Sequence, residues 1–82
     1  MRGFADLGDI PEDDRVAMIG SYVMAHPGVI TGFVVDTAAI AARYLRKLAL
    51  KYPHVEVIDQ APMNLGPNVT VTAVRVRKRA DV

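Results

Sequence analysis

The sequence predicts a small α/β domain, in which two helices pack on a three-stranded mixed sheet. Two segments repeat their apolar residues at helical spacing, three others are rich in β-branched residues, and prolines and glycines stand between most of these segments. Eighty-two residues are too few for two hydrophobic cores. Residues 1–82 are therefore expected to form a single domain, with an irregular segment at 1–9 and a flexible tail at 78–82.

The first helix is expected at about residues 10–25. Val16, Ile19 and Val23 recur at i, i+3 and i+7, which places them on one face, toward the core. Asp9 stands where its carboxylate can accept hydrogen bonds from the free amides of the first turn. A Pro-Gly pair after the segment ends the helix.

The first strand, 29–35, reads VITGFVV and is apolar on both faces. Such strands usually lie in the middle of a sheet, with both faces covered. The second helix follows at 36–52, where Asp36 or Thr37 is expected to cap its start and Pro53 to stop it. Its apolar face consists of Ile40, Ala41, Tyr44, Leu45, Leu48 and Tyr52.

The last third of the chain predicts two more strands, joined by a loop. Residues 54–59 alternate around Glu56 and form the second strand, whereas 60–68 contain two prolines, a glycine and two asparagines, which is typical of a loop. The third strand is expected at 69–79. Its apolar side changes near Ala73, which indicates either a bulge or a strand that runs past the end of the core.

These elements predict the sheet order 2-1-3. A right-handed crossover through the second helix makes the first two strands parallel, and the first strand, as the most apolar, takes the centre. The loop then carries the chain past the first strand, so that the third strand runs antiparallel to it. The alternative is order 1-2-3, in which the second and third strands form a plain hairpin.

The turn after the first strand, GFVVDT at 32–37, has the strand–turn–helix order with which many α/β proteins hold a phosphate. It lacks the spaced glycines of a dinucleotide site and the lysine of a P-loop, so we expect no nucleotide and no other cofactor. The longer segment 32–58 resembles strand–helix–strand units of helicase core domains. It covers about a third of the chain, without their phosphate-binding lysine, and the resemblance implies an α/β unit alone.

Asp36 and Asp59 are the candidates for catalysis. Both follow strands predicted to be parallel neighbours, at the carboxyl ends where open α/β sheets place their sites, and two adjacent carboxylates bind Mg²⁺. No third ligand or lysine partner accompanies them in the sequence. We therefore expect a non-enzymatic protein without a bound metal, and a metal-dependent activity at this pair is the alternative.

Charge is unevenly distributed along the chain, although the formal net charge is only +1. Acids dominate residues 1–14, whereas 43–51 and 75–79 contain cations and no acid. Such asymmetry predicts a polar surface for a partner, and two apolar residues of the predicted loop add to it. The residues expected to bind a macromolecule are Arg43, Arg46, Lys47, Met63, Leu65, Arg75, Arg77 and Arg79.

Together these features predict a small interaction or regulatory module that binds another macromolecule. A domain of this size without cysteines often gains stability by self-association, so a homodimer is expected. A protein partner with an acidic surface suits the cations, and a nucleic-acid-binding protein that uses the same cations is the alternative function. No apolar run is long enough to span a membrane, and the cytoplasm is the default location.

Overall fold

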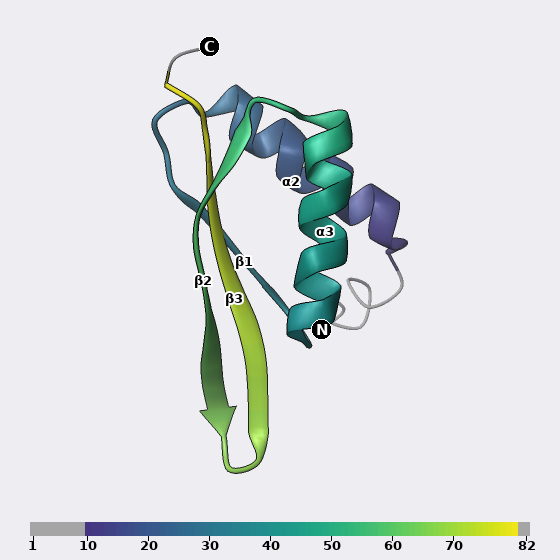
Figure 1. Cartoon of the computed structure of the whole chain (residues 1–82), viewed down its shortest axis with the longest axis vertical. Helices are drawn as coiled ribbons and strands as arrows, with labels where there is room; N and C mark the ends of the chain where they lie inside the picture. The colour runs from purple at the N-terminus through teal and green to yellow at the C-terminus, as the bar shows by residue number, and fades with distance from the viewer. Residues whose placement is uncertain (1–9, 81–82) are drawn as a thin grey trace, which may run out of the picture.

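A computed structural model of the protein describes residues 10–80 (Figure 1). The helices and strands are α2 (Glu12–Ala25), β1 (Thr31–Val35), α3 (Ala38–Lys51), β2 (Val55–Gly66) and β3 (Val69–Lys78). Both helices lie on the same face of the three-stranded sheet (Figure 1). The predicted α/β class, with two helices on three strands, is confirmed. The expectations for residues 1–9 and 81–82 lie outside the described residues, and Lys78 belongs to β3 rather than to a tail.

The strand order is β1-β3-β2, and β3 runs antiparallel to both of its neighbours. The predicted order 2-1-3 and its alternative 1-2-3 are therefore both wrong, as is the prediction of a mixed sheet. The third strand does run antiparallel to the first, as expected. The first two strands also share one direction, but β3 lies between them, so they are not neighbours.

The order 2-1-3 is excluded by a tight β2–β3 hairpin, in the segment where the sequence predicts a loop at 60–68. Gly66 pairs with Val69, so Pro67 and Asn68 alone form the connection, and Asn68 has a left-handed φ of 63°. Asparagine tolerates this conformation better than most residues. A two-residue connection keeps its strands adjacent. The hairpin therefore leaves β1 at the edge, and the pairing of β1 with β3 rather than with β2 puts β3 in the centre.

The position of β1 at the edge corrects a second expectation, that both of its faces are covered. Val35 is buried, but Val34 points to the other face of the sheet and is 49% exposed. The two residues before the strand, Val29 and Ile30, are also about half exposed. Segment 29–35 is therefore apolar on both faces although only one of its faces is buried within a single copy of the chain.

The third strand passes beyond the core, which was one of the two interpretations of its pattern. Thr72, Val74 and Val76 face the helices and are buried, whereas Val69 and Thr70 are exposed. The register shifts lie in β2 instead, between Val57 and Asp59 and between Asn64 and Gly66. The change in the apolar side of the strand near Ala73 therefore marks the point where the helices stop covering the sheet, and not a bulge in β3.

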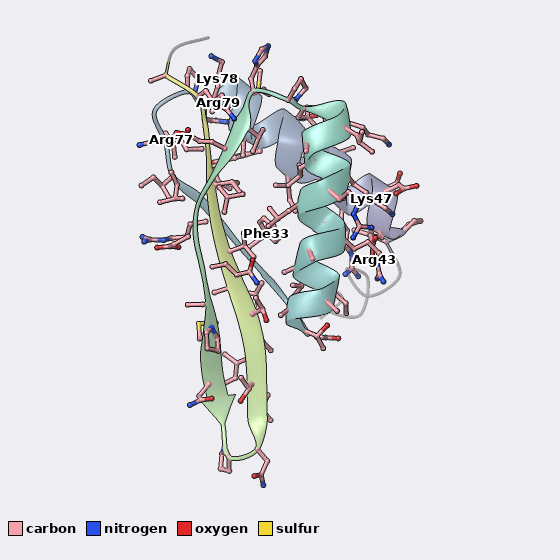
Figure 2. The ribbon with its side chains drawn as sticks, in the orientation of Figure 1. Phe33, Arg43, Lys47, Arg77, Lys78 and Arg79 are labelled. Atoms are coloured by element: carbon pink, nitrogen blue, oxygen red, sulfur yellow. The ribbon has the colours of Figure 1, made fainter. Side chains whose placement is uncertain are left out.

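The core lies between the two helices and β3. Its apolar contacts follow the predicted faces of both helices, because helical spacing brings those side chains to one side. Phe33 of β1 points toward α3 and stacks on Tyr44, with 5.8 Å between the ring centroids (Figure 2). The buried apolar residues are Val16, Val23, Val35, Ala41, Tyr44, Leu48, Val74 and Val76.

The two helices begin in different ways. Thr37 caps α3, since its Oγ1 accepts a hydrogen bond from the Ile40 amide at 3.1 Å, as one of the two predicted caps. Pro11 stands at the N-cap of α2 without a side-chain hydrogen bond, and its carbonyl accepts from the amides of Asp14 and Arg15. The predicted cap of this helix, Asp9, lies outside the described residues.

The β2–β3 hairpin extends well past the rest of the molecule and makes it elongated, with dimensions of 41 × 25 × 21 Å (Figure 1). The last pair that β1 makes is Val35 with Thr72, opposite Pro62 of β2. Beyond this row β2 and β3 continue as a two-stranded ribbon. We call the residues 63–71 of this ribbon the hairpin arm.

Candidate interaction surfaces

The cations of α3 face the acids at the start of α2. Arg43 donates to both carboxylate oxygens of Glu12, with Nη2 to Oε1 at 2.6 Å and Nε to Oε2 at 2.8 Å. Lys47 Nζ lies 2.8 Å from Glu12 Oε2 and 2.6 Å from Asp13 Oδ1. We call these four residues the helix seam. The seam joins the first turn of α2 to the middle of α3. Its ion pairs engage two of the cations that the sequence analysis assigns to a partner surface.

The seam also shifts the acid–base equilibria of its members. The hydrogen bonds from Arg43 and then Lys47 lower the pKa of Glu12 from 4.5 to about 2. The hydrogen bond from Lys47 lowers the pKa of Asp13 as well. In return, the carboxylates raise the pKa of both Arg43 and Lys47. The folded state therefore favours the charged form of all four residues.

The seam predicts acid sensitivity of the fold. Because folding lowers the pKa of Glu12, its contribution to stability is complete above pH 4.5 and is lost as the pH falls toward 2. Glu12→Gln should lower the melting temperature at pH 7, and its melting curve should approach that of the wild type as the pH falls through this range. Thermal melts by circular dichroism at several pH values measure both effects.

Asp14→Asn is the matched control, since Asp14 lies in the same helical turn and makes no ion pair with the described residues. Its melting temperature should follow the wild-type pH dependence. Equal pH profiles for Glu12→Gln and Asp14→Asn would contradict the role of the seam.

The cations of β3 pair with acids of β2 directly across the strands. Arg75 stands opposite Asp59 and donates from Nε to Oδ1 at 2.8 Å, with a second contact from Nη2 to Oδ2. Arg77 stands opposite Glu56, and its Nε and Nη2 donate to Oε2 at 3.0 and 2.8 Å. The hydrogen bonds from Arg75 lower the pKa of Asp59. Both pairs lie on the sheet face that the helices leave uncovered.

The predicted cationic residues therefore do not form one surface. Arg43 and Lys47 lie beside α3, whereas Arg77 lies on the far side of the sheet and Arg79 at the end of β3 (Figure 2). Four of the six predicted cations, at positions 43, 47, 75 and 77, are engaged by acids of the same chain. Arg46 and Arg79 are both exposed, and no ion pair within the described residues involves them.

Asp36 and Asp59 are not brought together. The sequence predicts that their strands are neighbours, but β3 lies between β1 and β2, and Asp59 stands within β2 opposite Arg75. Asp36 follows the end of β1, where the chain enters α3. Among residues 10–80 no three histidines, aspartates or glutamates gather as a metal site would require.

The hairpin arm contains the two predicted apolar contact residues, Met63 and Leu65. Their exposed fractions are 37% and 60%, and Val69 on the facing strand is 48% exposed. The whole stretch from 60 to 74 contains no Asp, Glu, Lys, Arg or His. Cross-strand support within the arm includes a hydrogen bond from Thr70 Oγ1 to Asn64 Oδ1 at 2.9 Å. The arm is thus an uncharged ribbon, open on both faces, with free strand edges.

A second apolar surface, which the sequence analysis missed, lies between α2 and the outer edge of β1. It is an open cleft of about 460 Å³, and Met18 and Tyr22 of α2 form one wall, each about half exposed. Val29 and Ile30 form the other wall. No charged residue lines this cleft. The signal in the sequence was the apolar segment 29–35, which we interpreted as a covered central strand.

Comparison with known proteins adds no assignment. No family model matches the sequence, and no curated protein or solved structure was found to match it. Across the described part of the chain, neither helix has the length and apolar character needed to cross a membrane.

Proposed function

We propose that this protein is a small non-enzymatic interaction module that binds another macromolecule through apolar surfaces and acts as a homodimer. The observation that carries the proposal is the hairpin arm, a ribbon of nine residues with exposed apolar side chains and no charge. Proteins that expose a strand edge usually protect it with charges, prolines inside the strand or a covering element. The arm has Pro67 in its turn and a register shift between Asn64 and Gly66, but no charge and no covering element among the described residues, so its free edges are suited to pairing with another chain.

Energetic considerations support the same proposal. An isolated two-stranded ribbon is marginally stable in water, because each strand has a single neighbour and little apolar surface is buried. A partner that covers the arm supplies both backbone hydrogen bonds and apolar contacts. Maintaining the exposed arm as a ribbon is therefore explained by a contact that the single chain does not contain.

The nucleic-acid alternative has less support. Binding to phosphates requires cations that are free to face the backbone, and most of the predicted cations already contact carboxylates. The arm itself carries no cation at all. An acidic protein partner depends on the same cations and loses support for the same reason.

Charged substitutions in the arm should abolish self-association. In the double variant Met63→Asp with Leu65→Asp, a contact that covers the arm would bury unpaired carboxylates, which costs several kcal/mol and corresponds to self-association on the order of 100-fold weaker. The solution mass by light scattering should fall from two copies to one. The fold should be retained, since both side chains are exposed.

Leu50→Asp is the control for this experiment. Leu50 is 79% exposed on α3 and belongs neither to the arm nor to the lining of the cleft, so its substitution should leave the mass at two copies. A wild-type mass of one copy at high micromolar concentration would overturn the homodimer. If Leu50→Asp also lowered the solution mass from two copies to one, the arm would not be the contact.

A further inference from the structure

The cleft between α2 and β1 has the features of a site for an added strand. As an edge strand, β1 pairs with β3 on one side, and the described residues contain no neighbour on its other side. Its outward backbone amides and carbonyls can therefore accept an extended chain. The walls that flank this edge, Met18 and Tyr22 on the helix and Ile30 before the strand, are apolar.

The hairpin arm has the complementary features. It presents extended backbone with free edges and carries Met63, Leu65 and Val69 as exposed apolar side chains. Neither the arm nor the walls of the cleft bear a charge, and Arg15 lies farther along β1, beside Phe33 and Val34. Contact of the arm with the cleft itself would therefore desolvate no ionised group. The uncovered face of the sheet differs in this respect, since it presents the ion pairs of Arg75 and Arg77.

The arm of one copy does not reach its own cleft. It continues β2 and β3 away from the helices (Figure 1). The residues that line the cleft belong to α2 and to the segment from Val29 to Gly32. The occupant must therefore come from another molecule. A second copy always carries an arm of the required chemistry.

We infer that two copies exchange arms, so that the hairpin arm of each lies in the α2–β1 cleft of the other and adds a strand to β1. This inference rests on the homodimer of the proposed function and assigns its contacts. Reciprocal exchange closes the dimer about a two-fold axis. It also forms two arm–cleft contacts, which doubles the buried area toward the roughly 1,200 Å² or more of stable interfaces.

Disulfide trapping tests the exchange, because the native chain contains no cysteine. Single-cysteine variants at arm positions 63, 65 and 69 are mixed with single-cysteine variants at cleft positions 18, 22 and 30, with different tags on the two sets. Mild oxidation with oxidised glutathione, which is reduced to two thiols, should give a mixed-tag disulfide dimer for at least one arm–cleft combination, at least about tenfold faster than an arm cysteine paired with Leu50→Cys.

The outcomes separate the possible arrangements. Arm cysteines that cross-link to one another faster than to the cleft would show arm–arm pairing and overturn the exchange. Faster cross-linking among cleft cysteines would show pairing of two β1 edges and would also overturn the exchange. The exchange would likewise be overturned if none of the nine arm–cleft combinations cross-linked faster than the Leu50→Cys control. In all three cases, a wild-type solution mass of two copies would still support the homodimer. A wild-type mass of one copy would contradict both the homodimer and the exchange of arms.

Discussion

Leu48→Ala should lower the free energy of unfolding by about 2–5 kcal/mol. Leu48 is 2% exposed and stands on the face of α3 that packs into the core. The substitution removes buried methyl groups and leaves a cavity that the neighbouring side chains fill only in part. Because a domain of this size is stable by only about 5–15 kcal/mol, a large share of the total would be lost. Urea denaturation measures the change.

The same helix offers a matched control two residues later. Leu50 is 79% exposed, and Leu50→Ala removes the same atoms from a site where they bury little surface. Its effect should stay within about 0.5 kcal/mol. If the two variants were equally destabilised, the packing of α3 on the sheet would be contradicted.

Gly20→Val should destabilise the domain by about 1–3 kcal/mol, although valine has a higher helix propensity than glycine. A Cβ at position 20 would overlap the ring of Tyr52, including Cγ, the ring atom nearest the backbone. The ring is held between the helices, where its hydroxyl lies 3.4 Å from Ser21 Oγ and 3.5 Å from the Ala17 carbonyl oxygen. Relief of the overlap therefore requires α2 and the end of α3 to move apart.

A double-mutant cycle with Tyr52→Ala isolates this contact. In the Tyr52→Ala background the space beside position 20 is open, so Gly20→Val should cost at least about 1 kcal/mol less than in the wild type. The free energies of unfolding of the four proteins, obtained from urea melts, provide the comparison. A cost that does not depend on residue 52 would mean that the ring is not the obstacle.

Local patterns predicted the helices and their buried faces well. The stripe that includes Tyr44 and Leu48 is buried as expected, and Thr37 caps α3. Helical hydrogen bonds and caps join residues three or four positions apart, so the interactions that decide a helix lie within a short window of sequence.

The candidate surfaces were predicted less well, because pairing between distant segments decides them. Arg43 and Lys47 appear as free cations in the sequence, and the acids that engage them lie more than thirty positions earlier, at Glu12 and Asp13. In contrast, Met63 and Leu65 were predicted as exposed apolar residues and are exposed, although on a ribbon rather than a loop.

By itself, the sequence determined the class of the fold, the registers of its two helices and the absence of charge in the segment that became the hairpin arm. Only the tertiary structure decided which strand lies in the centre. A two-residue turn at Pro67 and Asn68 pairs β2 with β3 where composition indicates a loop, and β1 then pairs with β3 rather than with β2. The same turn leaves β1 at the edge of the sheet, where its first residues line the cleft beside α2. Strand order depends on contacts between segments far apart along the chain, and no local pattern records them.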